Sequence, residues 1–297
     1  MLLPFPATVD LLVLSTAQTS DRSTVHRRLM LSGPECVPVE ADVIESGTGR
    51  PVVFLHGLVG LNEHWEGVVR QVEHRCRCVM LELPLLDLEG DDCSIDGVTR
   101  LTTDFLANHF DPGAGPWGRG VVLVGNSFGG HVALRIALES PELVDALVLA
   151  GSSGLIEKTF VRGAPVRPSR DWIEEKIGEL FHDKSKMAPG DVDRAHKVLS
   201  SRKGARAMVR LSKTARRNNL GVQIRGITQP TLLIWGREDV VTPPSAAEGF
   251  AELLPNSELV WLDECGHAPM LERPDEFTEA LLRFLDRLDA AAEPDAE

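Results

Sequence analysis

The chain has 297 residues, 43% of them hydrophobic, which is enough for one large domain or for one domain with an inserted lobe. Its formal net charge of -13 argues against a nucleic-acid-binding protein, because phosphate contacts need a basic surface. No apolar run reaches the length of a membrane span, and the apolar N-terminus lacks the basic segment of a signal peptide. Five cysteines without metal-ligand spacing predict reduced thiols in a cytoplasmic protein, with no metal site.

From residue 37 onward, short apolar runs alternate with amphipathic helical stretches. Runs such as VVFL, VVLV and TLLIW are apolar at every position, as strands of a parallel sheet covered by helices on both faces must be. This alternation predicts an α/β fold with right-handed crossovers. The strand-like runs cover residues 37–45, 51–55, 76–83, 120–125, 146–150, 231–235 and 258–262. The helical stretches cover residues 65–73, 95–110, the segment after Ser127, 245–253 and 274–288.

Residues 155–220 interrupt this rhythm, because they contain helical segments and a loop with two prolines at 163–169 but no strand of the same kind. An interval of this length predicts an inserted cap. It has 16 Lys and Arg against 8 Asp and Glu, a surplus of eight positive charges, whereas the rest of the chain has a net charge of -21. The basic side chains either face the pocket and attract an anionic substrate, or pair with the acidic core domain. The predicted division is an N-terminal extension at 1–36, a core domain at 37–154 and 221–290, and a helical cap at 155–220.

The strongest signal for chemistry is the segment Gly125-Asn126-Ser127-Phe128-Gly129, which follows an apolar strand and opens a helix. A strand can turn this tightly into a helix only where glycines remove side chains that would clash with neighbouring backbone. The turn exposes Ser127 at the helix N-terminus and leaves the backbone N–H of Phe128 free to face an oxyanion. The segment therefore predicts a nucleophilic serine.

A serine nucleophile needs a base, and the base needs an acid that orients it. A buried strand at 231–235 ends in a loop with Asp239, and the next strand ends shortly before His267. The order Ser127, Asp239, His267 places all three residues at the carboxyl ends of parallel strands, where active sites of such sheets lie. We therefore predict Ser127 as nucleophile, His267 as base and Asp239 as acid, with Glu238 and Asp263 as alternative acids.

Four segments in this order resemble the α/β-hydrolase superfamily: Phe54-Leu-His56-Gly57, the elbow, WGREDVVTPP and ECGHAPMLERP. The resemblance extends over residues 37–288. It implies a mostly parallel, eight-stranded sheet with helices on both faces, a helical cap after the sixth strand, and no cofactor. It also implies a second oxyanion donor in the backbone N–H of Leu58, with Val59 as the alternative.

Other conspicuous residues have structural explanations. His56 is expected to be structural because His267 already fills the role of base. His64 and His131 are expected at the pocket wall or on the surface. We expect simple packing for the remaining residues, which are Trp65, Trp172, Trp235 and Cys265.

Ser127 disfavours relatives with an aspartate nucleophile, such as epoxide hydrolases and haloalkane dehalogenases. The favoured function is a serine esterase for small or medium acyl esters. The alternative is a hydrolase that cleaves carbon–carbon bonds in vinylogous diketone acids; the elbow with Gly129-Gly130 is similar to that group, but its members have tryptophan after the histidine, where this chain has Ala268. A non-catalytic receptor on the same fold is the third hypothesis. The expected partner is a small-molecule substrate, anionic if the cap charges face it, and the expected state is a monomer or homodimer.

Overall fold

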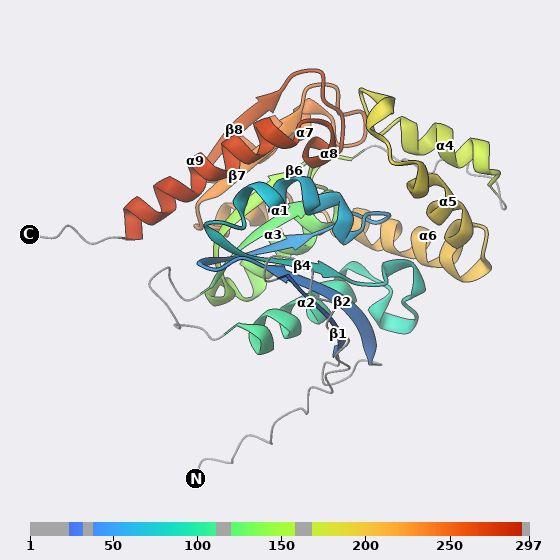
Figure 1. Ribbon diagram of the computed structural model, residues 1–297, viewed down its shortest axis with the longest axis horizontal. Coiled ribbons are helices and arrows are strands. Elements are labelled where there is room, and N and C mark those ends of the chain that lie inside the picture. Colours follow the sequence, from blue (N-terminus) through green and yellow to red (C-terminus); the bar gives the residue numbers. More distant parts are fainter. Residues whose placement is uncertain (1–23, 32–37, 111–119, 158–167, 293–297) are drawn as a thin grey trace, which may run out of the picture.

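The computed structural model describes residues 24–31, 38–110, 120–157 and 168–292 (Figure 1). Within these residues, eight strands form one sheet in the order β1-β2-β4-β3-β5-β6-β7-β8. The β1–β2 and β2–β4 pairs are antiparallel, and all other pairs are parallel. This confirms the predicted fold class. The strands are β1 (Val25–Leu31), β2 (Val39–Ser46), β3 (Arg50–Leu55), β4 (Cys76–Glu82), β5 (Val121–Asn126), β6 (Val144–Ala150), β7 (Thr231–Gly236) and β8 (Ser257–Leu262).

Helices cover both faces of the sheet (Figure 1). Helices α1 and α9 pack against each other on one face, and α2 packs against α3 on the other. The described helices of the core domain are α1 (Glu66–Val72), α2 (Ile95–His109), α3 (Phe128–Glu139), α7 (Pro244–Leu253), α8 (Pro269–Glu272) and α9 (Pro274–Ala292). Short 3-10 turns are η1 (Asn62–Trp65), η2 (Leu85–Asp87), η3 (Gly90–Asp92), η4 (Pro141–Leu143) and η6 (Gly221–Gly226).

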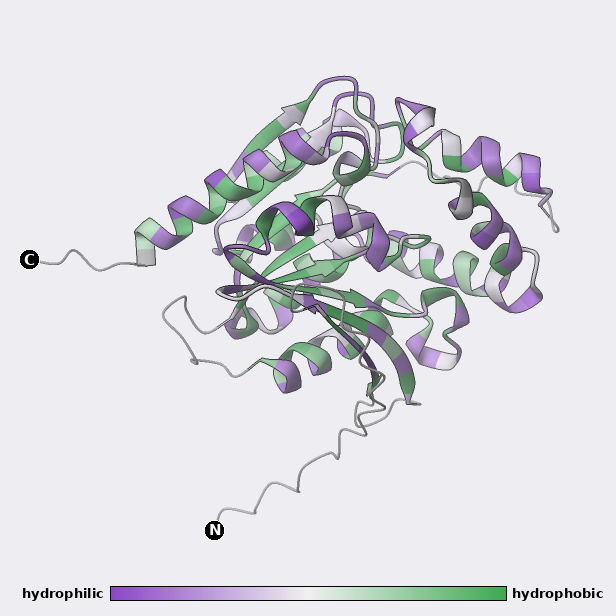
Figure 2. Ribbon diagram, viewed as in Figure 1, coloured by the Kyte–Doolittle hydropathy of each residue, from purple (hydrophilic) through white to green (hydrophobic). Residues whose placement is uncertain are grey.

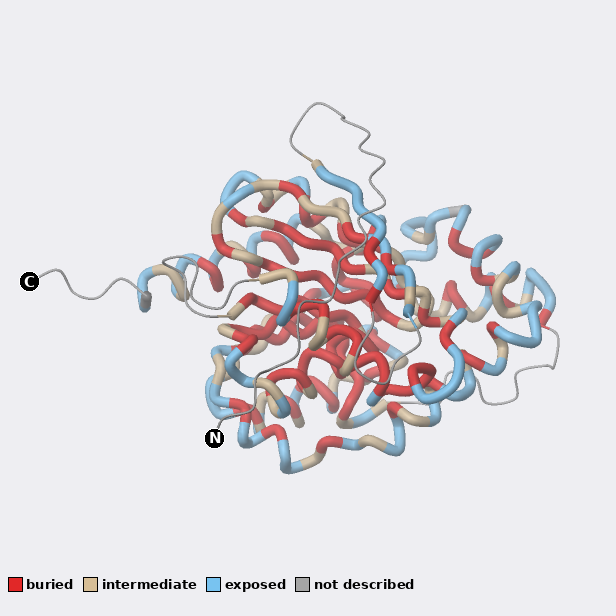
Figure 3. The backbone as a smooth tube through the Cα atoms, turned by 90° about the horizontal axis from the view of Figure 1, so that it is seen from below, coloured by how far each residue is buried: buried red, intermediate tan, exposed pale blue. Residues whose placement is uncertain are grey.

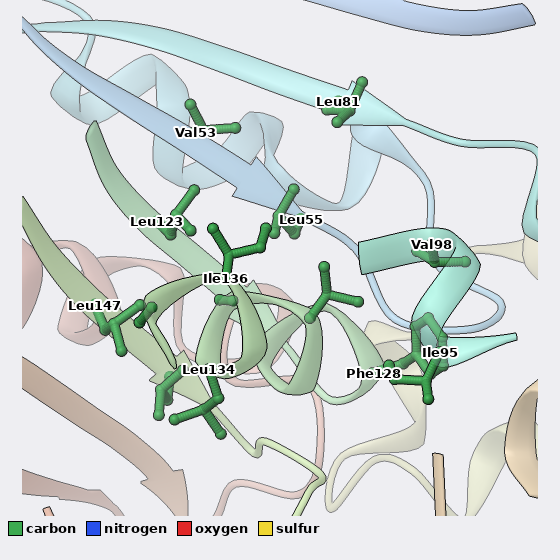
Figure 4. Packing of buried hydrophobic residues seen from close by; sticks show 14 of the residues in the cluster. Val53, Leu55, Leu81, Ile95, Val98, Leu123, Phe128, Leu134, Ile136 and Leu147 are labelled. Carbon is green, nitrogen blue, oxygen red and sulfur yellow. The ribbon is translucent and has the colours of Figure 1, made fainter. Parts of the chain in front are cut away.

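The apolar runs build two hydrophobic clusters, one on each face of the sheet. Successive strand residues alternate between them: Val53 belongs to the cluster of α2 and α3, and Phe54 to the cluster of α1 and α9. This alternation follows from the two-residue period of a strand. Figure 4 shows Phe128, the first residue of α3, beside Ile95 and Val98 of α2. The central strands are almost entirely buried, and exposed backbone lies at the periphery (Figure 3).

The first strand was missed by the sequence analysis, which assigned residues 1–36 to an extension outside the core domain. Val25–Leu31 forms β1 and pairs with β2 along its whole length, Leu31 opposite Val39 and Val25 opposite Glu45. The sequence VHRRLML concealed it because β1 lies at the sheet edge, where five of its seven side chains are exposed. Such a strand lacks the continuous apolar run by which the central strands were recognised.

In the described part of residues 155–220, where the sequence predicted a cap, the chain forms three helices and one 3-10 turn. They form a layer beside the sheet, at the end where the parallel strands terminate (Figure 1). Figure 2 shows long hydrophilic stretches on them, in contrast to the apolar strands. Most of the loop expected at 163–169 lies outside the described residues. None of the described helices is both long and apolar enough to cross a membrane. The cap elements are α4 (Arg170–Gly178), η5 (Lys184–Lys186), α5 (Pro189–Leu199) and α6 (Arg202–Arg217).

Candidate active site

Ser127 is the single residue between β5 and α3, and its backbone has the left-handed φ of 52° with ψ of -116°. Such a conformation is strained in a residue with a side chain, costs about 1–3 kcal/mol, and persists only where the surrounding structure imposes it. The glycines on either side explain the tight turn. A Cβ atom at Gly125 would lie 2.5 Å from the Gly130 nitrogen, and one at Gly129 would lie 2.3 Å from the Leu55 carbonyl oxygen.

Backbone hydrogen bonds hold Ser127 in this conformation. Its N–H donates to the carbonyl oxygen of Ala150 at 3.1 Å, and its own carbonyl oxygen accepts from the N–H of Ser153 at 3.1 Å and of His131 at 3.2 Å. The neighbouring side chain of Asn126 donates to the carbonyl oxygens of Ala150 and His267, at 2.9 and 3.1 Å. Asn126 thus ties the elbow to the backbone of the predicted base, a role that the sequence analysis did not assign.

His267 and Asp239 form the hydrogen-bonded pair that the sequence predicted. His267 Nδ1 lies 2.8 Å from Asp239 Oδ2, and both residues are at least 95% buried. The other carboxylate oxygen accepts from the backbone N–H groups of Val241 and Thr242, at 2.8 and 2.9 Å. The Thr242 hydroxyl adds a contact of 2.8 Å to Asp239 Oδ2. Because Nδ1 faces a carboxylate, it carries the proton, and Nε2 is left as the acceptor.

Three consecutive backbone N–H groups around His267 are each held by a different segment. Cys265 donates to the Glu238 carboxylate at 2.9 Å, Gly266 to that of Glu272 at 2.7 Å, and His267 to the carbonyl oxygen of Leu180 at 2.7 Å. Glu238, an alternative acid in the sequence analysis, therefore contacts the histidine loop and not the imidazole. Asp263, the other alternative, is exposed and pairs with Arg237.

Glu272 links the histidine loop to the cap. It is 97% buried, and its Oε2 accepts from the backbone N–H groups of His182 and Asp183, at 2.7 and 3.0 Å, while Oε1 accepts from Gly266. Burial raises the pKa of this carboxyl, and the backbone donors act in the opposite direction. The sequence analysis quoted this residue within ECGHAPMLERP but assigned it no role.

A cavity of about 200 Å³ lies between the core domain and the cap, and Ser127 and His267 both line it. Its wall is mainly apolar, with contributions from both parts of the chain. The apolar cap residues that line it include Trp172, Ile177, Leu180, Phe181, Leu199 and Met208. Trp172 was predicted as core, but it is only partly buried and faces this cavity; Trp65 and Trp235 are fully buried, as predicted.

The predicted oxyanion donors lie at the same cavity. Phe128 and Leu58 both line it, as does Val59, the alternative to Leu58. Within the described part of the chain, the N–H groups of Phe128 and Leu58 donate to no other residue. Since Ser127 precedes a twelve-residue helix, the partial positive charge of its N-terminus also faces this region.

The remaining histidines differ in their surroundings. His56 lies outside this cavity, with Nδ1 2.7 Å from the Gly57 carbonyl oxygen, and burial lowers its pKa to about 4. His131 is fully buried beneath the elbow, where burial lowers its pKa to about 4. His64 lines the cavity and lies 3.3 Å from Asp191 of α5. A neutral His56 fits the structural role that the sequence analysis expected.

One group of possible metal ligands occurs among the described residues: Glu63, His64 and Asp191, whose ligand atoms lie within 4.8 Å of one another. The guanidinium of Arg194 contacts both carboxylates. A positive charge therefore already occupies the position between them, and the cluster serves as an ion-paired contact between η1 and α5.

The basic residues of the cap differ in their surroundings. Lys203 and Arg210 of α6 pair with Glu89 and Asp91 of the core domain, at 3.1 and 3.3 Å. These pairs correspond to the second of the two interpretations of the cap charge. Two other basic side chains of the described cap, Lys176 and Arg216, line the cavity.

Comparisons with known proteins agree with this architecture. A family model described as the alpha/beta hydrolase family matches residues 52–280. A pimeloyl-[acyl-carrier protein] methyl ester esterase of Nitrosomonas europaea is 30% identical over 259 residues, which cover 78% of this chain and 94% of that protein. A 2-hydroxy-6-oxo-6-(2'-aminophenyl)hexa-2,4-dienoic acid hydrolase of Metapseudomonas resinovorans is 28% identical over 289 residues, 91% of this chain and 94% of that protein.

Solved structures give the same result. An alpha/beta hydrolase enzyme from a metagenome of lagoon sediments at Mar Chica, Morocco, has a TM-score of 0.66 at 31% identity, over 84% of this chain and 96% of that one. A serine hydrolase involved in carbazole degradation has a TM-score of 0.72 at 27% identity, over 89% of this chain and 100% of that one. These relatives are hydrolases, and the family model covers well over half of the sequence. The chain belongs to the alpha/beta hydrolase family and is a hydrolase.

Proposed function

We propose that the chain is a serine hydrolase that cleaves a small or medium acyl ester through an acyl-enzyme on Ser127. The observation that supports this most directly is the 2.8 Å hydrogen bond between His267 and Asp239 at the cavity that Ser127 also lines. This bond fixes the imidazole with Nε2 as acceptor, which is the form that a general base requires.

In the proposed reaction, Ser127 Oγ attacks the ester carbonyl carbon, and His267 Nε2 takes the hydroxyl proton. The carbonyl oxygen becomes an oxyanion, which accepts hydrogen bonds from the backbone N–H groups of Phe128 and Leu58. When the carbon–oxygen bond to the alcohol breaks, the imidazolium donates its proton to the leaving oxygen. A water molecule then attacks the acyl-enzyme by the same sequence and releases the carboxylic acid and free Ser127.

Asp239 keeps the imidazole oriented and stabilises its protonated form during each step. The backbone donors at Val241 and Thr242 fix the carboxylate in turn. An arrangement that is already assembled before the substrate arrives needs little reorganisation during the reaction. Each residue of the proposed triad is therefore anchored by the chain itself.

The apolar wall of the cavity favours an uncharged acyl chain. The similarity to the Nitrosomonas europaea methyl ester esterase supports ester cleavage. The second candidate is carbon–carbon bond cleavage, which the similarity to the Metapseudomonas resinovorans dienoic acid hydrolase over 91% of the chain supports. Ala268 after the histidine, where tryptophan is typical of that group, favours the ester.

The deciding experiment compares p-nitrophenyl esters of graded chain length with a ring-fission dienoate as substrates of the purified protein. We expect turnover of the esters; turnover of the dienoate alone would replace the proposal by the second candidate. Fluorophosphonate labelling addresses the remaining hypothesis of a receptor without catalysis. We expect labelling that Ser127→Ala abolishes, and folded protein that takes up no label would support the receptor.

We also propose a cytoplasmic location and a monomeric or homodimeric state. The four described cysteines, Cys76, Cys78, Cys93 and Cys265, are buried free thiols, as expected in a reducing compartment. Burial raises the pKa of the Cys76 thiol to about 11, which keeps it protonated and unreactive. Light scattering of the purified protein would distinguish a monomer or dimer from a higher oligomer.

A further inference from the structure

Thr242 lies in the loop after β7 that also carries Asp239, and its side chain is completely buried. Its hydroxyl oxygen lies 2.8 Å from Asp239 Oδ2, 3.0 Å from the Gly151 carbonyl oxygen and 3.2 Å from His267 Nδ1. The side chain therefore reaches both the hydrogen bond between acid and base and the segment that follows β6. The sequence analysis quoted this residue within WGREDVVTPP but assigned it no role.

The hydroxyl group has one proton for two acceptors, the carboxylate of Asp239 and the carbonyl oxygen of Gly151. The carboxylate is the closer acceptor and, as a charged group, the stronger one. His267 Nδ1 donates to the same oxygen at 2.8 Å, so Oδ2 has two donors. The other oxygen has two as well, the backbone N–H groups of Val241 and Thr242. The roughly four acceptor positions of a carboxylate are thereby all filled.

The position of the Thr242 hydroxyl is fixed from two sides. The carbonyl oxygen of Thr242 accepts from the indole N–H of Trp235 at 2.8 Å, and Trp235 is fully buried in β7. Gly151, with a left-handed φ of 51°, lies directly against the acid–base pair. A Cβ atom there would be 3.0 Å from Asp239 Oδ2 and 3.1 Å from His267 Nδ1. This close approach brings the Gly151 carbonyl oxygen within reach of the hydroxyl.

We propose that Thr242 is a positioning residue of the reaction, whose hydroxyl holds Asp239 Oδ2 in line with His267 Nδ1 while the imidazole gains and loses its proton. Without this hydroxyl, the imidazole would be the one remaining donor to Oδ2 among the described residues, and the two groups could shift together. With it, the oxygen keeps its place in both protonation states of the imidazole. An orientation that persists through the reaction needs little reorganisation. The inference rests on the proposed function, because it concerns proton transfer from Ser127.

The test compares Thr242→Val, which has nearly the same shape but no hydroxyl, with Thr242→Ser, which keeps the hydroxyl. For the p-nitrophenyl ester that the wild-type enzyme turns over fastest, Thr242→Val should lower kcat about tenfold with little change in KM, because the loss acts on proton transfer and not on binding. The rate of fluorophosphonate labelling at Ser127 should fall by a similar factor. Thr242→Ser should recover most of both rates.

Urea unfolding shows whether Thr242→Val is folded. If it is not, Thr242→Cys replaces it, because a thiol is only a weak donor, and the same fall of kcat at constant KM is expected. Wild-type kcat per folded molecule in the variant used, or a Thr242→Ser protein as slow as Thr242→Val, would overturn the inference.

Thr278→Val is the matched control. Thr278 is also buried, on α9, but its hydroxyl has no hydrogen-bond partner among the described residues, and it does not line the cavity. The same replacement at this position should leave kcat, KM and the labelling rate unchanged. An equal loss of kcat in this control would mean that the effect is not specific to Thr242 and would refute its role.

A spectroscopic measurement separates this inference from the proposed function. If the wild-type protein neither hydrolyses the esters nor reacts with the fluorophosphonate, the proposed function fails. Nitrogen-15 NMR of protein labelled in its histidine rings still reports the acid–base pair, and His267→Gln assigns the signals of His267. Thr242→Val should change the Nδ1 shift of His267, whereas Thr242→Ser and Thr278→Val should not. Identical shifts in the wild-type protein and Thr242→Val would refute the role of Thr242 independently of catalysis.

Discussion

The backbone N–H of His267 donates a hydrogen bond to the carbonyl oxygen of Leu180, 2.7 Å away, directly after helix α4 of the cap. The adjacent N–H of Gly266 is held by Glu272, whose second oxygen binds the cap backbone at His182. The position of the imidazole therefore depends on the cap as well as on the sheet. Any change that loosens this junction should affect the reaction as well as stability.

Replacement of Glu272 by Gln tests this dependence. The amide NH₂ of glutamine cannot accept a hydrogen bond. Either the N–H of Gly266 or the N–H groups of His182 and Asp183 therefore lose their acceptor. An unsatisfied buried N–H costs about 1–3 kcal/mol, and we expect the free energy of unfolding to fall by that amount. We also expect kcat to fall about tenfold with a smaller change in KM, because misplacement of the base acts mainly on the chemical step.

Steady-state kinetics and urea unfolding measure these two quantities. Glu276→Gln, which removes an exposed carboxylate on α9 near Arg273, is the matched control and should leave both unchanged. A variant that is destabilised yet fully active per folded molecule would restrict Glu272 to a structural role.

Ser127→Ala should abolish turnover without unfolding the protein. The backbone hydrogen bonds that impose the left-handed conformation do not involve the side chain. Comparable serine variants lose on the order of 10⁶ in kcat. The measurements are ester turnover and thermal unfolding, with contaminating hydrolases excluded by labelling; substantial residual activity would remove Ser127 from the mechanism.

Asp239 and Glu238 are adjacent in sequence but should respond differently to loss of charge. Asp239→Asn places an amide beside His267 Nδ1 and favours the wrong tautomer, so kcat should fall by on the order of 10⁴. Glu238→Gln affects only the contact with the Cys265 N–H, so kcat should fall less than about tenfold. Similar losses in both variants would show that the pair in the structure is not the functional one.

The sequence predicted the features that are determined by residues close to one another along the chain. The central strands were found because burial on both faces requires an unbroken apolar run, and the elbow because its turn requires Gly125 and Gly129. Glu272 was missed because its partner His182 lies 90 positions away along the chain. No local pattern reports such contacts. The sequence likewise left open whether the basic side chains of the cap face the pocket or pair with the core domain, because it does not show the ion pairs of the cap helices.

The two buried histidines predict a loss of stability in mild acid. Burial lowers the pKa of His131 from 6.5 to about 4, and it has the same effect on His56. Between these two values the unfolded chain binds protons at these sites and the folded chain does not. The contribution of each site is therefore fully present above pH 6.5 and is lost progressively as the pH falls toward 4.

His131→Gln isolates one of these contributions. Linkage predicts that His131 lowers the free energy of unfolding by about 2 kcal/mol between pH 7.5 and pH 5. Glutamine does not titrate and can still bond to Asn218, which lies 3.2 Å from His131 Nε2. The difference in unfolding free energy between these two pH values should therefore be about 2 kcal/mol smaller in the variant, while the part that His56 contributes remains. Urea denaturation at both pH values measures it, and the same pH dependence in both proteins would mean that His131 is not held neutral by burial.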